Sequence, residues 1–264
     1  MNYIVLDFEF NQAFSFQPDR PAPTNPSMPC EIIQIGAVKL NETMEVKETY
    51  SVLVQPKLYQ KMHPKVQKIT GIRWEMLKNQ PHFPAVYQDF LRFIGPEMAV
   101  LCSWGVDDIK ALFRNIYYHH LDDAPMTKNY INVQAIAGKK LQGEDPSHSM
   151  GLQKAVELLQ LPEDRRFHDA LNDAYYTSLV LAATIPERLS LSLFTPMDLE
   201  GRKEPLSRPF FPSLLSHLEK ELGRTLTKEE EALARKAYKL GRKKAFDIPV
   251  KKKKDKKDFS GENN

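Results

Sequence analysis

The sequence predicts an α/β fold in which helices pack on a mixed β-sheet. Three short apolar runs follow one another near the N-terminus, a pattern typical of an antiparallel meander. Two further apolar runs in the middle of the chain are each followed by a helical pattern, and two more helical stretches come after them. With 264 residues, 42% of them hydrophobic, the chain can bury the core of one larger domain with an appendage.

The first expected strand leads directly into two acidic residues. Tyr3–Leu6 is an apolar run suited to the middle of a sheet, and Asp7 and Glu9 follow it. Residues at i and i+2 of a strand point to the same face, so two negative charges about 7 Å apart would repel each other there. A divalent cation, which prefers carboxylate oxygens, would stabilise the pair. The alternative is that the strand ends at Leu6 and both acids lie in a solvated turn.

A proline-rich loop separates this strand from the next two. Residues 11–29 contain five prolines and show no periodicity. A long loop that starts beside the acidic pair could cover a site there. Residues 31–40 form the second expected strand, residues 41–43 a turn and residues 45–54 the third strand, which pair most simply in an antiparallel manner.

Helices and strands are expected to alternate over the rest of the domain. Pro64 suits the first turn of a helix at 63–69, which residues 70–72 end. The other elements expected from periodicity and turn residues are a helix at 84–94, a strand at 99–104, a helix that begins at Asp107 or Asp108, a strand at 130–133 followed by a helix, a helix at 149–161 and a long helix at 169–184.

The C-terminal part of the chain is expected to lie outside the main domain. Residues 187–212, rich in serine and proline, are assigned to a linker or a strap over the body, and residues 213–245 to a helical extension of two helices. Thr227 and Glu230 fit a capping box at the start of the second helix. Residues 246–264 are too charged to bury a core and are expected to form a disordered, lysine-rich tail.

Positive charge is concentrated near the C-terminus. Residues 242–257 hold nine basic and two acidic residues, which suits either a polyanion-binding extension or simple solubilisation. No apolar run is long enough to cross a membrane, and the N-terminus has no signal-peptide pattern. Cys30 and Cys102 suit buried free thiols, so we expect a cytoplasmic protein with no membrane partner.

Three further polar residues could join the acidic pair. Asp108 follows an apolar strand near the start of a helix, and His168 and Asp173 lie around the start of the long helix. Sites in α/β sheets gather at strand ends and helix N-termini. Four carboxylates and a histidine could therefore converge in one cleft, as in a two-metal site for phosphodiester hydrolysis.

The spacing of His168 and Asp173 restricts how they can meet. Five residues correspond to about 140° around a helix, so His168 has to lie in the preceding loop and Asp173 in the first turns. Asp169 then suits the helix N-cap. Taken singly, His168 could be an exposed loop histidine and Asp108 a helix cap, and the neighbouring Asp107 could exchange roles with Asp108.

Three motifs occur in a particular order along the chain. They are Asp-Phe-Glu at 7–9, Trp-Gly-Val-Asp-Asp-Ile-Lys-Ala-Leu at 104–112 and His-Asp-Ala-Leu-Asn-Asp-Ala at 168–174. Together they resemble the motifs of the DEDDh 3′–5′ exonucleases, the superfamily of ribonuclease T and polymerase proofreading subunits. The arrangement is most similar to the branch of bacterial KapD-like proteins and eukaryotic histone-mRNA and small-RNA exonucleases. The resemblance covers about residues 1–186, taken as an exonuclease domain, and implies a ribonuclease-H-like mixed sheet with helices on both faces.

The resemblance implies roles for the polar constellation. Two Mg²⁺ or Mn²⁺ ions would be held by four carboxylates: Asp7, Glu9, Asp108 and Asp173. His168 would be the general base, and the family pattern favours Asp108 over Asp107 because the ligand falls three residues after the glycine, here Gly105.

The resemblance also implies which residues lie against the terminal nucleotide: Phe8, Phe10, Gly71 and Ile72. Many relatives have threonine where this chain has Phe10. Packing in the core is the alternative role for Ile72 and for Trp104.

The implied activity is metal-dependent 3′–5′ hydrolysis of single-stranded ends to nucleoside 5′-monophosphates, with RNA favoured over DNA by the branch alone. The alternative is a non-catalytic adaptor that binds nucleic acid through its basic C-terminal region. The presence of all five expected polar residues argues against that alternative. The sequence predicts no particular protein partner.

Overall fold

A computed structural model of the protein describes residues 1–15, 24–143, 150–186, 190–199 and 211–242. The chain forms two compact units, Met1–Glu200 and Gly201–Asn264, and each is described by itself. The expected tail at 246–264 and the middle of the expected loop at 11–29 lie outside the described residues.

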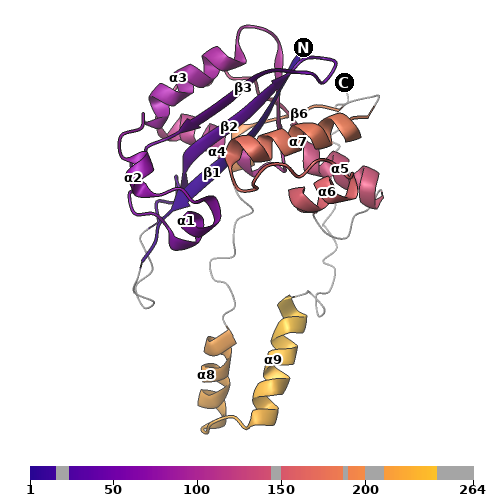
Figure 1. Ribbon diagram of the computed structural model, residues 1–264. Coiled ribbons are helices and arrows are strands. Elements are labelled where there is room, and N and C mark those ends of the chain that lie inside the picture. Colours follow the sequence, from indigo (N-terminus) through magenta and orange to yellow (C-terminus); the bar gives the residue numbers. More distant parts are fainter. Residues whose placement is uncertain (16–23, 144–149, 187–189, 200–210, 243–264) are drawn as a thin grey trace, which may run out of the picture. The chain divides into compact units, whose positions relative to one another are not determined.

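A six-stranded mixed sheet forms the centre of the first unit (Figure 1). Its strands are β1 (Asn2–Gln12), β2 (Cys30–Leu40), β3 (Val46–Leu53), β4 (Ala99–Ser103), β5 (Asn129–Asn132) and β6 (Ser192–Leu193). Their spatial order is β3-β2-β1-β4-β5-β6. The first three strands pair in an antiparallel manner, whereas β4 is parallel to β1 and β5 to β4. The predicted α/β fold with an antiparallel meander is confirmed.

β1 is longer than the apolar run that predicts it. Tyr3–Leu6 is buried, and the strand continues through Asp7 and Glu9 to Gln12. It continues because β2 pairs with it over this whole length, with Cys30 opposite Gln12. The alternative of a solvated turn after the apolar run is therefore wrong, and both acids lie within paired β-structure.

Helices cover both faces of the sheet (Figure 1). One face packs against α3 (Phe83–Ile94) and α4 (Asp107–Tyr118). The other packs against α5 (Val133–Gln142), α6 (Leu152–Leu158) and α7 (Ala170–Thr184). Because side chains alternate along a strand, β1 contributes to both cores. Tyr3 and Val5 face α7, whereas Ile4, Leu6 and Phe8 face α3 and α4.

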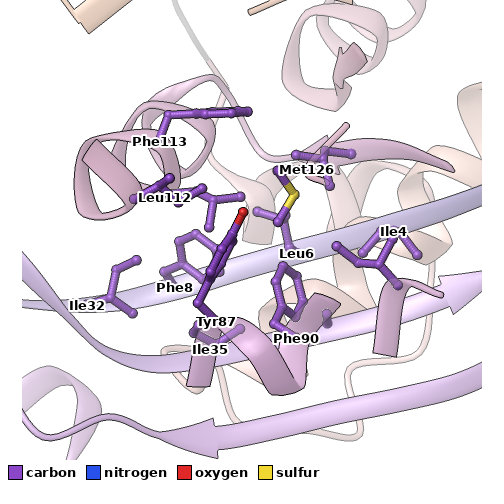
Figure 2. Packing of buried hydrophobic residues seen from close by; sticks show 14 of the residues in the cluster. Ile4, Leu6, Phe8, Ile32, Ile35, Tyr87, Phe90, Leu112, Phe113 and Met126 are labelled. Atoms are coloured by element: carbon purple, nitrogen blue, oxygen red, sulfur yellow. The ribbon is translucent and has the colours of Figure 1, made fainter. Parts of the chain in front are cut away.

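The core between the sheet and α3 and α4 is rich in aromatic rings. Figure 2 shows side chains of β1 and β2 beside Tyr87 and Phe90 of α3 and Leu112 and Phe113 of α4. Tyr87 and Phe90 are at most 1% exposed. This packing fixes the position of β1, and therefore of the carboxylates on its other face.

Two short helices follow β3: α1 (Pro64–Thr70) and α2 (Trp74–Leu77). α1 has Pro64 in its first turn and ends at Gly71, whose φ of 79° is in the left-handed region that suits glycine. α2 was not predicted, because four residues are too few to show a period. α6 is shorter than the predicted helix at 149–161: it begins after Gly151, and its last residue is Leu158.

Part of the range expected as a linker or strap belongs to the first unit. β6 pairs with β5, and the 3₁₀ turn Pro196–Leu199 follows it. Between them Phe194 is 2% exposed, and its ring stacks on Phe113 with centroids 4.0 Å apart. Its N–H donates to the Lys128 carbonyl at 2.8 Å. A two-residue strand has no periodic signal, which is why the sequence alone does not predict it.

The second unit contains α8 (Phe211–Leu222) and α9 (Lys228–Arg242). The predicted capping box at the start of α9 is confirmed. The Thr227 N–H donates to Glu230 Oε2 at 2.8 Å, and the Glu230 N–H donates to Thr227 Oγ1 at 3.2 Å. Arg224 also donates to Glu230, at 2.7 Å.

The two cysteines are free, with Cys102 buried and Cys30 partly buried, so the expected free thiols are confirmed. Within the described ranges, no helix has both the length and the apolar character needed to cross a membrane.

Replacing Phe194 by alanine is expected to destabilise the first unit by about 3–5 kcal/mol, because a buried, stacked ring is lost. Leu193→Ala is the matched control. The Leu193 side chain is 63% exposed, so its loss should change the free energy of unfolding by about 0.5 kcal/mol or less. Urea unfolding of both variants measures the difference. Equal changes in the free energy of unfolding would contradict the conclusion that the buried Phe194 ring stabilises the first unit.

Candidate active site

Asp7 and Glu9 project from the face of β1 that packs against α7. They share this face with Tyr3 and Val5, because alternate residues of a strand point the same way. Both acids are partly exposed, whereas the residues that precede them are buried. The strand therefore presents two carboxylates at the edge of the core.

α7 brings a third carboxylate to this pair. Asp173 lies in the first turn of α7 and is 9% exposed. Asp169 is the N-cap of α7, as predicted, and its Oδ1 accepts the N–H of Asn172 at 3.2 Å. One carboxylate oxygen each from Asp7, Glu9 and Asp173 lie within 4.8 Å of one another. The structure thus brings together three of the four predicted metal ligands.

Two residues of β2 hold the N-terminus of α7 against the sheet. Gly36 is paired with Asp7, and a Cβ atom on it would lie 2.1 Å from the carbonyl carbon of Ala170. Gln34 donates from Nε2 to Asp169 Oδ2 at 3.0 Å, and its Oε1 accepts the Ala170 N–H at 3.3 Å. The first turn of α7 reaches the carboxylates of β1 because residue 36 has no side chain.

Neither Gln34 nor Gly36 was among the predicted site residues, although the sequence contains a signal for each. A glycine inside an apolar strand often marks a close approach by another backbone. A polar residue in a strand that is otherwise apolar needs a polar partner. The sequence does not say which element supplies that backbone or that partner.

The fourth carboxylate, Asp108, comes from the first turn of α4. It is 7% exposed, and although burial raises its pKa, the backbone groups of Phe8 and of Asp108 itself lower it. Its charge is also one of the causes that raise the pKa of Asp7, so the two carboxylates are neighbours. Asp107 is exposed, so of the two adjacent aspartates it is Asp108 that faces the site.

The pKa values of all four carboxyl groups are raised above the ordinary range. Burial is the largest cause for each, and the negative charges of neighbouring carboxylates add to it. The pKa is raised to about 8 for Glu9, about 7 for Asp108 and about 6 for Asp173. The pKa of Asp7 is raised well above its usual value as well. Without a cation, the cluster therefore keeps protons near neutral pH.

The donor atoms of the cluster fit a divalent cation. Asp173 Oδ1 is buried and has no hydrogen-bond partner among the described residues. A buried carboxylate oxygen without a donor or a cation costs free energy. An all-oxygen set of carboxylates is the kind of site that Mg²⁺ and Mn²⁺ prefer.

His168 lies in the loop immediately before α7, and its side chain is exposed. Its N–H donates to Asp173 Oδ2 at 3.1 Å. Its φ of 64° is in the left-handed region, which costs a residue other than glycine about 1–2 kcal/mol. The preceding Phe167 stacks on Tyr176 of α7 with centroids 4.5 Å apart. The predicted arrangement, with His168 before the helix and Asp173 in its first turn, is confirmed.

The four residues expected against the terminal nucleotide differ in their surroundings. Phe8 and Ile72 are each 4% exposed, Phe8 in the core and Ile72 in a small cluster with Leu77. Phe10 contacts Phe8 edge-on at 6.3 Å and packs against the core on the face away from the acidic pair. Gly71 is exposed. The structure therefore places the Phe8, Phe10 and Ile72 side chains in apolar packing.

Four carboxylates and a histidine lie at one end of a mixed α/β sheet, which is the arrangement that the resemblance to the DEDDh exonucleases implies. The exonuclease family model matches residues 4–181, and the chain belongs to this family. The resemblance inferred from the three motifs is confirmed.

The chain is similar in sequence to two proteins of known name. The chain is 27% identical over 224 residues to the PolC-type DNA polymerase III of Thermotoga petrophila, which covers 83% of this chain and 15% of the polymerase. It is 28% identical over 141 residues to ERI1 exoribonuclease 3 of Mus musculus, which covers 50% of this chain and 39% of that protein. The chain thus matches only a part of each relative.

Solved structures share the fold at lower identity. A 3′-exonuclease that recognises the 3′ end of the histone mRNA stem-loop has a TM-score of 0.60 at 20% identity, covering 73% of this chain and 84% of that one. The nuclease domain of the DEDDh family member 3′hExo, bound to rAMP, has a TM-score of 0.58 at 23% identity, covering 69% and 90%. These likenesses confirm the expected ribonuclease-H-like fold.

Asp7→Asn is expected to stabilise the metal-free protein at pH 8. The raised pKa values mean that the folded chain holds more protons than the unfolded chain, whose carboxyl pKa values are about 4. Stability in EDTA therefore falls as the pH rises from about 4, the pKa of the unfolded chain, and levels off above about 8, where the cluster has ionised. The amide removes one of the repelling charges. Melting temperatures in EDTA at pH 6 and pH 8 measure the effect, and a variant that melts below the wild type at pH 8 would contradict it.

Gly36→Ala is expected to lower the free energy of unfolding by about 1–3 kcal/mol and to weaken cation binding, because the start of α7 must move away from β2. Gly151→Ala is the control, since Gly151 has an ordinary φ of −74° and no atom within 4 Å of the added methyl group. Thermal unfolding with and without Mn²⁺ measures both effects. A smaller loss for Gly36→Ala than for Gly151→Ala would rule out the close packing at position 36.

Proposed function

We propose that the protein is a metal-dependent 3′–5′ exonuclease that degrades single-stranded nucleic acid, RNA in preference to DNA, to nucleoside 5′-monophosphates. One observation carries the proposal: oxygens of Asp7, Glu9 and Asp173 meet within 4.8 Å, and His168 stands at the start of the same helix as Asp173. Membership of the exonuclease family supports it.

The carboxylates would act as the metal ligands. Asp7, Glu9, Asp108 and Asp173 would hold two Mg²⁺ or Mn²⁺ ions. When bound, these ions lower the pKa of the attacking water and neutralise charge on the scissile phosphate. Asp173 Oδ2 holds the main chain of His168 at the same time.

His168 would accept the proton from the attacking water. Its imidazole is exposed, and its backbone is fixed by Asp173 and by the stacking of Phe167, so the ring can meet a water molecule outside the buried cluster. The water oxygen then bonds to phosphorus at the terminal linkage, and the bond from phosphorus to the 3′-oxygen breaks. The leaving 3′-oxygen takes up a proton from solvent, so the shortened strand ends in a 3′-hydroxyl group, and the released nucleotide keeps the 5′-phosphate.

The proposed RNA preference rests on the relatives. ERI1 exoribonuclease 3 and the exonuclease of the histone mRNA stem-loop support RNA, whereas the PolC-type relative is a DNA polymerase. A comparison of matched RNA and DNA single strands and duplexes, each labelled at the 5′ end, decides between them. Faster hydrolysis of the DNA single strand would overturn the RNA preference without affecting the nuclease assignment.

Asp7→Ala is expected to abolish release of nucleoside 5′-monophosphates in Mg²⁺ or Mn²⁺, because the site loses a carboxylate ligand.

His168→Ala is expected to lower kcat by about 10²–10⁴-fold with little change in strand binding, because it removes the proton acceptor. Product analysis over a time course measures both effects. Asp7→Ala with most of its activity would disprove the metal assignment, and an unchanged kcat in His168→Ala would remove His168 as the base.

The same assay separates this function from the non-catalytic adaptor. A nuclease shortens the labelled strand in Mg²⁺ and stops in EDTA. An adaptor retains the strand at full length under both conditions, and its binding weakens when residues 246–264 are deleted.

A further inference from the structure

The segment Arg165–His168 is attached to α7 by several contacts. The Tyr176 hydroxyl accepts the Arg165 N–H and donates to the Arg165 carbonyl, both at 2.7 Å. Asn172 donates from Nδ2 to the Arg166 carbonyl at 3.0 Å. The main chain that leads to His168 is therefore held in one place relative to the carboxylate cluster.

The Arg166 side chain leaves this segment and reaches α1. One guanidinium nitrogen donates to the Ile69 carbonyl at 3.0 Å, in the last turn of that helix. The other terminal nitrogen lies 3.3 Å from where a Cβ atom on Gly71 would be. Arg166 thus joins the loop that carries the expected base to the turn that was expected to meet the terminal nucleotide. The lack of a side chain at Gly71 leaves room for the guanidinium.

The charge of Arg166 is not compensated within the described part of the chain. Its side chain is exposed, and no described carboxylate forms an ion pair with it. A guanidinium has five N–H donors, and the Ile69 carbonyl uses one of them. The neighbouring Arg165 is different, because its guanidinium lies over the Tyr175 ring, 3.7 Å from the centroid.

A positioned guanidinium with free donors is suited to bind phosphate oxygens, often through two parallel hydrogen bonds. In the proposed function, the scissile phosphate lies at the carboxylate cluster. Arg166 has no hydrogen bond or ion pair with Asp7, Glu9 or Asp173, and points to Ile69 and Gly71 instead. The printed contacts of the guanidinium therefore lie at the Ile69–Gly71 turn and not at the carboxylate cluster.

We propose that Arg166 binds the phosphodiester of the substrate strand that lies upstream of the scissile linkage. This inference rests on the proposed exonuclease function. Arg166 would hold the strand in register while the terminal linkage is hydrolysed, so it would contribute to strand binding and not to the chemical step. A substrate with only one phosphodiester would gain nothing from it.

Substrate length tests this assignment. A dinucleoside monophosphate contains only the scissile phosphodiester, whereas an eight-residue oligonucleotide also contains upstream ones. Arg166→Ala is expected to raise KM for the longer substrate by about tenfold with kcat little changed, and to leave the dinucleoside monophosphate unaffected. Arg166→Lys is expected to recover part of the loss, because it keeps the charge but not the planar fork.

The salt dependence of binding gives a second readout that a purely structural role would not change. With the longer strand in EDTA, Arg166→Ala is expected to flatten the slope of log Kd against log salt by about 0.7, the value for one lost contact to a single strand. Arg166→Lys should keep the wild-type slope. Lys47→Ala is the control. Lys47 lies near the start of β3 and forms an ion pair with Glu97. It is at the other end of this strand from Leu53, the residue that lies opposite Gln34 of β2 in the sheet.

Three outcomes would overturn the proposal. They are an equal rise in KM for both substrates, no rise for either, and a slope that changes as much in Lys47→Ala as in Arg166→Ala. A wild-type protein that hydrolyses neither substrate in Mg²⁺ or Mn²⁺ would instead refute the proposed function itself, so the two failures are distinguishable.

Discussion

The candidate site depends on the contact between the first turn of α7 and β2 at Gly36. The helix can lie against the strand backbone because this position has no side chain. Gln34 then fixes the helix start through its hydrogen bonds to Asp169 and Ala170. Asp173, one turn into the helix, reaches the carboxylates of β1 as a consequence. Without this contact, the site would lose Asp173 and keep only the carboxylates of Asp7, Glu9 and Asp108.

Four carboxylates that lie close together repel one another, which lowers the stability of the folded state. The fold offsets this repulsion more for the carboxylates on helices than for those on β1. Asp108 and Asp173 lie in the first turns of α4 and α7, where free N–H groups and the helix dipole favour negative charge. Asp173 also accepts the backbone N–H of His168. Glu9 lies on a strand, without a helix terminus of its own, and its pKa of about 8 exceeds the value of about 6 for Asp173. The two carboxylates on β1, Asp7 and Glu9, are therefore the ones that a bound cation would stabilise most.

The sequence predicts the elements of the site better than the contacts that assemble them. The first three strands, α7, its N-cap and the polar residues all follow from periodicity, spacing and motif. The contact at Gly36 does not, because it depends on which helix lies above the strand. Alternation along β1 also explains why Phe8 is buried: the geometry that turns Asp7 toward α7 turns Phe8 into the opposite core. β6 and α2 escape prediction because they are too short to show a pattern.

Asp173 links the buried half of the site to its exposed half. The carboxylates belong to elements with well-packed cores, whereas His168, Arg166 and Gly71 are exposed. Asp173 Oδ2 accepts the His168 N–H and so holds the backbone of that loop in its left-handed conformation. Oδ1 of the same carboxylate is buried without a partner among the described residues. The two oxygens therefore serve different sides of the site, and a cation can bind Oδ1 without releasing the loop that Oδ2 holds.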